Sequence, residues 1–445
     1  MRSISQVAKV LHEVFGNCAD EADQATQVVQ RTRKFTPRIL ARTFVLAYLQ
    51  NPEARSPQIA AMAANIGVDV SPQAVDQRFT PRLAAFFEHL FRRMTRVVVG
   101  ADKALAPLLE RFTRVVVLDS TTIALPDTQR ERFRGCGGAA GRGQAALKLQ
   151  TELDLRTGAL QSIRIEEGRQ TDVATVLQHA PAEKGLLRIA DLGYFSLPVF
   201  AALAGAGAFF LSRAQYHTSL WIDGRKTGLV DWLKGCGEAL VDRKVELGAG
   251  QRLACRLIAW RLPAEMVAQR RRKLRRKHQK KTGGTPCQAA LEACGWMFLV
   301  TNVPPERMSV AEAAVLYRSR WQIELLFKRW KSLGHIDRFE PDGDVAGMVK
   351  FWARLCAVLA QHWLTVAAAW SPEGNLSLTR ITRLTREVAV QLGWALSLPG
   401  RRRLEEVVEL LARMARSACR RNKRSQPGTF ELLRNPELLN YAFSP

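Results

Sequence analysis

The sequence is short of acidic residues. Against 66 Lys and Arg stand only 41 Asp and Glu, which leaves a net charge of +25. A field this positive favours a polyanionic partner, with nucleic acid the first candidate and an anionic membrane surface the second. The length of 445 residues and the hydrophobic fraction of 47% are those of an ordinary globular protein with several domains.

The sequence also lacks an apolar run long enough to span a membrane. Its most apolar long stretch, residues 351–370, is interrupted by Arg354, Gln361 and His362 and predicts a buried helix. The N-terminus carries no long apolar run, so we expect no secretion signal. None of the eight cysteines belongs to a CxxC pair, which argues against structural zinc and against a disulfide framework. We therefore expect a cytoplasmic protein with reduced thiols and no membrane partner.

Residues 1–105 are expected to form a helical N-terminal region that binds DNA. Ser56 and Ser71 each precede a Pro, as is typical of an N-cap followed by Pro at the first helical position, and Gly67 lies between them. This spacing is that of a helix-turn-helix whose second helix starts near Pro72. It is equally that of two packed helices joined by a Gly turn.

A mixed α/β core is predicted to begin after this region, with its first part at 106–213. A helical stretch is expected between the third and fourth strands, and Ser196 is expected to open a helix before the fifth. Thr157 and Gly158 mark a hairpin turn. The expected strands are the β-branched or alternating runs at 114–120, 147–155, 159–167, 185–191 and 208–213.

Residues 214–295 interrupt the core and are expected to form a β-rich, basic insertion. Within it, 270–281 holds nine Lys or Arg in twelve positions and is expected to be a solvated loop. If DNA is the partner, this loop contacts phosphates, and the residues assigned to that contact are Arg271, Arg272, Arg275 and Arg276. The second part of the core follows at 296–370, and 371–445 is predicted to be a helical C-terminal region.

Three acids could carry chemistry. Asp119 and Asp191 end two apolar strands, and Glu324 lies on the predicted helix YRSRWQIELLFKRWK (317–331). A strand-end Asp can also be a simple terminator or N-cap, and Glu324 can belong to ordinary surface ion pairs. Converging carboxylates suit a pair of divalent ions that cut phosphodiesters, and Mg²⁺ prefers such oxygen ligands.

On the predicted helix, Tyr317, Arg320, Glu324 and Lys331 fall within about 60° of one another. The spacing Tyr317-x2-Arg320-x3-Glu324-x6-Lys331 is the YREK signature, and the chain closely resembles a DDE transposase of the insertion-sequence 4 family. LDSTTI (118–123) and IADLGYFS (189–196) are similar to its two acidic motifs.

The resemblance implies an RNase H-like catalytic core in which Asp119, Asp191 and Glu324 hold two Mg²⁺ ions, with Mn²⁺ able to replace them. It implies nicking of transposon-end DNA to release a 3′-hydroxyl, which then attacks the opposite strand or target DNA. It also implies a homodimer in a synaptic complex, with 371–445 supplying part of the dimer contact, and a bacterial, nucleoid-associated location. Leu192 departs from the pattern, since many relatives carry Arg there.

Further residues are assigned to DNA contact. Arg320 and Lys331 can bind phosphates, and Tyr317 can donate a hydrogen bond to the same backbone. Trp296 precedes Glu324 by 28 residues, where related enzymes stack a flipped base, although a core Trp at the head of a strand is the alternative. Arg213, at the end of a strand, is a further candidate.

Two other functions stay open at this point. One is a metal-dependent, structure-specific DNA nuclease on the same core. The other is a transposase-derived DNA-binding protein without catalysis. A strand-transfer assay with labelled DNA ends separates the first from a transposase, and binding without cleavage in Mg²⁺ or Mn²⁺ identifies the second.

Overall fold

The chain forms two compact units. Unit 1 comprises Met1–Leu105, Ser120–Gln170 and Gln322–Lys423, and unit 2 comprises Ala106–Asp119, Thr171–Trp321 and Arg424–Pro445. The computed structural model describes residues 2–31, 33–137, 144–339, 344–370, 376–422 and 426–439. Among the described helices, none combines the length and hydrophobicity that a transmembrane span requires. All eight cysteines are free thiols.

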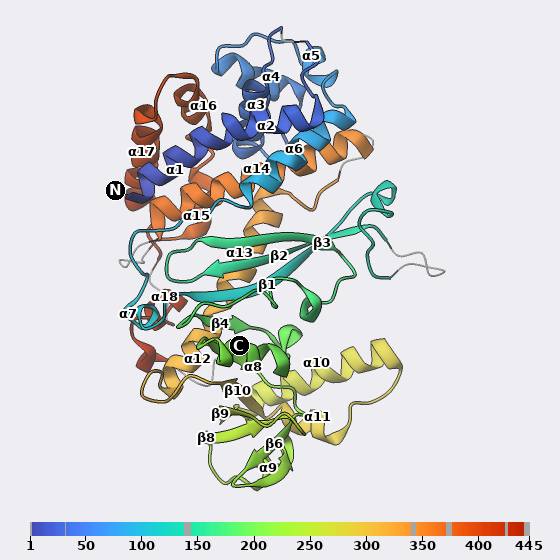
Figure 1. The fold of residues 1–445 in the computed structure, drawn as a ribbon, viewed down its shortest axis with the longest axis vertical. Helices are drawn as coiled ribbons and strands as arrows, with labels where there is room; N and C mark the ends of the chain where they lie inside the picture. Colours follow the sequence, from blue (N-terminus) through green and yellow to red (C-terminus); the bar gives the residue numbers. More distant parts are fainter. Residues whose placement is uncertain are drawn as a thin grey trace. The chain divides into compact units, whose positions relative to one another are not determined.

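Helices from both ends of the sequence pack together in unit 1, where the blue and orange helices of Figure 1 lie side by side. The rings of Phe91 and Trp352, one from each group, lie 6.0 Å apart. The N-terminal group is α1 (Arg2–Val14), α2 (Asn17–Thr26), α3 (Pro37–Gln50), α4 (Ser56–Asn65), α5 (Pro72–Asp76) and α6 (Pro81–Met94). The C-terminal group is α13 (Trp321–Gly334), α14 (Asp344–Ala369), α15 (Leu378–Leu384), α16 (Ala389–Ser397) and α17 (Arg402–Ala418).

The expected N-caps of the helix-turn-helix-like segment are half right. The Ser71 hydroxyl accepts a hydrogen bond from the Ala74 amide at 3.2 Å, and Gly67 adopts φ +86° in the turn. Ser56, by contrast, is the first residue of α4, and Arg55 is its N-cap. Because α5 has only five residues, the structure favours two packed helices over a helix-turn-helix with a full recognition helix.

Unit 1 also contains a β-hairpin beside the later part of β1 (Val115–Ala124). The strand order is β3-β2-β1, where β2 is Ala146–Asp154 and β3 is Leu160–Glu167. Gly158 turns the hairpin with φ +72°, as predicted. The buried His362 of α14 bonds the Gly158 carbonyl at 2.9 Å, so the long helix is fixed to the hairpin turn.

Unit 2 continues from the first part of β1 in the order β1-β4-β5-β10-β9-β8-β6-β7. β1, β4 and β5 are parallel, and β10 runs antiparallel to both β5 and β9. The strands are β4 (Leu187–Ala190), β5 (Phe209–Arg213), β6 (Ser219–Ile222), β7 (Arg225–Gly228), β8 (Leu240–Leu247), β9 (Leu253–Arg261) and β10 (Trp296–Thr301). The insertion strands therefore extend the same sheet.

Helices pack against these strands in unit 2. Phe200 of α8 stacks on Phe210 of β5, with ring centroids 4.4 Å apart. The helices are α7 (Pro107–Glu110), α8 (Leu197–Gly205), α9 (Leu229–Gly235), α10 (Ala264–Thr282), α11 (Gln288–Ala293), α12 (Val310–Ser319) and α18 (Thr429–Leu432). The 3₁₀ turns of this unit are η3 (Asp172–Ala174), η4 (Leu192–Tyr194) and η5 (Pro436–Leu438), whereas η1 (Asp127–Gln129) belongs to unit 1.

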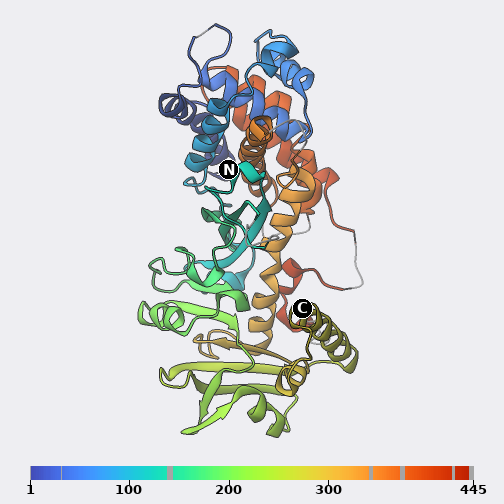
Figure 2. The ribbon, with the colours of Figure 1, turned by 90° about the vertical axis from the view of Figure 1, so that its right-hand side faces the viewer.

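Three sequence-based expectations are wrong at the level of elements. The helical stretch expected before β4 is only the 3₁₀ turn η3. The basic run expected to be a loop lies on α10, which Figure 2 shows as a regular helix beside the strands. The insertion is also less purely β than predicted, because it carries α9, α10 and α11. The five-part domain division stays a prediction, since the two units combine segments from several of its parts.

Candidate active site

Asp119 and Asp191 occupy matching positions on neighbouring parallel strands. Leu118 of β1 pairs with Ala190 of β4, and each aspartate is the next residue in the sequence, Asp119 within β1 and Asp191 directly after β4. Because adjacent strands lie about 4.8 Å apart and matching residues face the same side, the two carboxylates lie close together. Both residues are half-buried. β1 continues beyond Asp119 to Ala124, so this aspartate lies within the strand rather than at its end.

A third strand adds a positive charge to the same row. Ser212 of β5 pairs with Ala190, and Arg213 therefore occupies the position on β5 that Asp191 occupies after β4. Arg213 acts on Asp191 through its charge and helps to lower the pKa of that carboxyl. Two acids and one base thus stand on three successive parallel strands.

Tyr317 and Arg320 each bind one of these aspartates. The Tyr317 hydroxyl donates to Asp191 Oδ1 at 3.0 Å, and Arg320 Nη1 donates to Asp119 Oδ2 at 3.1 Å. Both side chains are nearly inaccessible, with Tyr317 4% and Arg320 7% exposed. Tyr317 belongs to α12 and Arg320 directly follows it; the start of this helix is fixed by a capping box in which the Ser309 hydroxyl accepts from the Glu312 amide.

The electrostatics of this row keep Asp191 ionised. Burial acts to raise the pKa of Asp191, but the charge of Arg320 and the hydrogen bonds from the Leu192 amide and Tyr317 outweigh it, and the net direction is downward. Burial, assisted by the negative charge of Asp191, raises the pKa of Tyr317. At neutral pH the tyrosine is therefore a protonated donor and the aspartate an ionised acceptor.

The signature segment is two helices rather than one. α12 ends at Ser319 and α13 begins at Trp321, so Arg320 lies at the junction. Glu324 is half-buried in the first turn of α13. In unit 1, Lys331 of the same helix donates from Nζ to the Thr122 carbonyl of β1 at 2.9 Å.

Glu324 belongs to unit 1, whereas Asp119 and Asp191 belong to unit 2. The meeting of the three carboxylates therefore stays a prediction. Within the part of the chain that the structure describes, no group of three or more His, Cys, Asp or Glu side chains is arranged to hold a metal ion.

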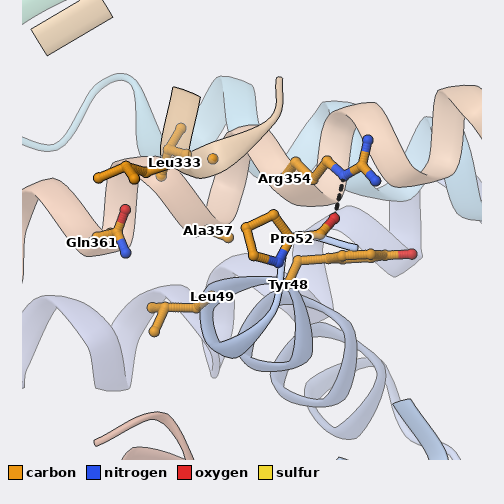
Figure 3. A pocket seen from close by; sticks show the side chains of 9 residues that line it. Tyr48, Leu49, Pro52, Leu333, Arg354, Ala357 and Gln361 are labelled. Carbon is orange, nitrogen blue, oxygen red and sulfur yellow. Dashed lines mark hydrogen bonds between the residues drawn. The ribbon is translucent and has the colours of Figure 1, made fainter. Parts of the chain in front are cut away.

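Two arginines fix the end of α13 and the segment after it inside unit 1. Arg354 of α14 is 2% exposed and donates from Nη1 to the Arg338 carbonyl at 2.8 Å and from Nε to the Pro52 carbonyl at 2.7 Å. Figure 3 shows the hydrogen bond to Pro52 at a small pocket that Tyr48 and Gln361 also line.

Arg386 donates to the Leu333 carbonyl in the last turn of α13 at 2.7 Å. A cation at a helix C-terminus complements its dipole, so Arg386 supports the helix that carries Glu324, while Arg354 holds the segment that follows this helix.

Trp296, the tryptophan assigned to base stacking from the sequence, is buried. It is 6% exposed within the core of unit 2, and the Arg261 guanidinium lies 4.6 Å from the centre of its ring. This placement fits the alternative of a core Trp, and base stacking by Trp296 stays untested. Trp321, which the sequence reasoning passed over, is 44% exposed directly after Arg320.

The basic helix α10 has two faces. Val267, Arg270, Arg271 and Leu274 are half-buried at helical spacing. Arg271 donates from Nε to the Leu291 carbonyl at 3.0 Å, and it thus helps to anchor the helix. Three of the arginines assigned to DNA from the sequence are exposed, namely Arg272, Arg275 and Arg276.

Comparison with known proteins decides the family. Residues 110–360, more than half of the chain, match the family described as "Transposase DDE domain". The chain belongs to this family. The transposase assignment made from the YREK signature and the mixed α/β, RNase H-like fold class are thereby confirmed. Enzymes of this family cut and join DNA in transposition and generally use divalent metal ions.

Two sequence relatives are transposases of insertion sequences. The transposase is 27% identical over 342 residues to the transposase for insertion sequence element IS231F of Bacillus thuringiensis subsp. israelensis, covering 72% of this chain and 71% of the relative. It is 27% identical over 313 residues to the transposase for IS1151 of Clostridium perfringens, with 64% of each chain covered. The cryo-EM structure of the piggyBac transposase synaptic complex with hairpin DNA aligns over 95% of this chain and 87% of that one, with 8% identity and a TM-score of 0.43.

Proposed function

We propose that this transposase cuts transposon-end DNA with Asp119, Asp191 and Glu324 as its catalytic carboxylates. The observation that carries the proposal is the pairing of Leu118 with Ala190, which brings the first two carboxylates to adjacent positions on parallel strands. Glu324 is the third carboxylate because it completes the signature on α13.

Asp119, Asp191 and Glu324 would together hold two Mg²⁺ ions. Mg²⁺ is bound through carboxylate oxygens while it retains several waters, and Asp191 is held ionised at neutral pH. Bound ions of this kind would activate the attacking water or 3′-hydroxyl and stabilise the leaving oxygen. Mn²⁺, which takes the same oxygen ligands, would substitute.

The chain's own residues would position the DNA. Lys331 and Arg213 are assigned to the phosphates near the cut, and the exposed arginines of α10 to phosphates farther along the duplex. Trp321 is a better stacking surface for an unpaired base than Trp296, because only Trp321 is exposed.

The released 3′-hydroxyl would then join target DNA. We propose that two copies of the chain hold two transposon ends in a synaptic complex, with the C-terminal region contributing to the dimer contact. The net charge of +25 and the DNA substrate suit a location at the bacterial nucleoid.

Glu324→Gln tests the catalytic assignment, because it keeps the size of the side chain and removes its charge. We expect Mg²⁺-dependent cleavage of labelled ends to fall roughly a thousandfold, since losing a metal ligand forfeits several kcal/mol of transition-state stabilisation, while binding of the ends persists. The matched control is Glu306→Gln, which changes an exposed glutamate and should leave cleavage intact.

If Glu324→Gln cleaves at the rate of the parent, Glu324 is not a catalytic carboxylate. Cleavage by the parent without any joining of 3′-ends to a second duplex would instead indicate a nuclease.

A further inference from the structure

Arg320 holds the carboxylate that the proposed function gives to a metal ion. Its Nη1 atom lies 3.1 Å from Asp119 Oδ2. The exposed fractions of the two side chains are only 8% and 18%, so water screens the pair weakly. A guanidinium and a divalent cation repel one another, and both require the same carboxylate.

Tyr317 stands in a different relation to its aspartate. Its hydroxyl is neutral and donates to Asp191 Oδ1. A carboxylate that ligates a metal commonly keeps such a hydrogen bond, which orients it. Tyr317 can therefore remain on Asp191 when a metal ion binds, whereas the positive charge of Arg320 opposes metal binding at Asp119.

A DNA phosphate can replace Asp119 as the partner of Arg320. The guanidinium binds carboxylate and phosphate with the same planar fork of donors. Arg320 also lies between α12 and α13 rather than inside either helix, so a change of partner need not break a helical turn.

We propose that Arg320 exchanges Asp119 for a phosphate of the transposon end, and that this exchange couples metal binding to DNA binding. Without DNA, Arg320 neutralises Asp119 and keeps metal affinity low. With an end bound, the phosphate holds the guanidinium, and Asp119 is available to the cation. Coupling between two ligands is reciprocal, so metal must tighten DNA binding by the same factor.

The inference rests on the proposed function, and metal binding rather than cleavage tests it. The full chain is titrated with Mn²⁺, alone and in complex with a pre-cut transposon-end duplex that lacks the 3′-hydroxyl. We expect the Mn²⁺ affinity of the parent to rise at least about 10-fold with DNA, within the usual range of coupling between sites. Equal affinities with and without DNA would overturn the exchange, and that result needs no variant.

Three variants sharpen the result. Arg320→Gln should bind Mn²⁺ more tightly than the parent in the absence of DNA and lose most of the coupling. Tyr317→Phe should weaken Mn²⁺ binding by about 10-fold in both states, as loss of a supporting hydrogen bond does. Lys328→Gln removes an exposed charge from α13 and should keep the coupling of the parent. Unchanged or weaker Mn²⁺ binding by DNA-free Arg320→Gln would also overturn the exchange.

Asp119→Asn separates this inference from the proposal beneath it. If this variant, in complex with DNA, binds Mn²⁺ like the parent, Asp119 is not a metal ligand and the proposed site is wrong. If the variant loses that binding while Arg320→Gln behaves like the parent, only the exchange is wrong.

Discussion

At the scale of single residues, exposure separates two tryptophans that the sequence cannot rank. Trp321→Ala removes an accessible aromatic face, and we expect it to weaken the holding of an unpaired terminal base by about 1–3 kcal/mol, the usual worth of base stacking. Fluorescence of 2-aminopurine placed at the transposon end measures this, and Trp321→Phe should retain most of the effect because it keeps a ring.

The matched comparison is Trp296→Ala. Since Trp296 lies in a packed core, its truncation should lower the stability of the chain by about 3–5 kcal/mol. If Trp296→Ala loses base stacking but keeps the melting temperature of the parent, Trp296 is the stacking residue.

The hydrogen-bond partners of the signature residues could not be predicted from the sequence. Tyr317 and Asp191 are separated by 126 positions, and no local pattern states that the hydroxyl and the carboxylate meet. Asp119 and Asp191 were identifiable because each follows an apolar, strand-forming run. Arg354 gave no signal of its role, because a charged residue within an apolar helix can serve many purposes.

At the scale of elements, α10 presents its exposed arginines as a regular row. Arg272 and Arg276 lie one helical turn apart and are both exposed. Changing both to Gln should lower the slope of log affinity against log salt by about 2, since each phosphate contact contributes about 0.9. Filter binding of the end duplex across a salt series measures the slope.

The control for this pair is Arg413→Gln with Arg416→Gln, which removes two exposed charges from α17. If the control lowers the slope as much as the α10 pair does, the effect comes from net charge and not from contacts of α10.

The strands were predictable and α10 was not, for a physical reason. Val115, Val116 and Val117 of β1 are β-branched and buried, and such runs favour strands because their side chains pack well on a pleated sheet. The charge density of the basic run resembles that of a solvated loop, yet Lys and Arg are good helix formers. Val267 and Leu274 supply the stripe by which that helix packs, and this weak pattern is hidden among the charges.

At the scale of the whole molecule, one buried histidine ties stability to pH. His362 is buried, and burial, only partly offset by its bond to Gly158, lowers its pKa from 6.5 to about 4. The unfolded chain takes up this proton below pH 6.5 while the folded chain does not. The contribution of His362 to the free energy of unfolding is therefore fully present above pH 6.5. About 3 kcal/mol of it is lost as the pH falls to about 4.

In the His362→Gln variant, the urea concentration at the unfolding midpoint should change less between these two pH values than it does in the parent. The reason is that Gln does not titrate and can still donate to the Gly158 carbonyl. His12→Gln, at an exposed position of α1, should keep the parental profile. The same loss of stability in His362→Gln as in the parent would assign the acid sensitivity to other groups.

In sequence order, the insertion at 214–295 looks like a segment that could be removed. In the structure, however, its strands are an integral part of the sheet. Trp296 pairs with Arg261, and the pairing of β10 with β9 continues to Thr301 opposite Arg256. Excising the insertion would bare six residues of backbone donors and acceptors along β10. A shortened enzyme would therefore expose an unpaired edge strand that can pair with other molecules and aggregate. Efforts to shorten the enzyme should replace β9 with another strand rather than join the two ends of the excised segment directly.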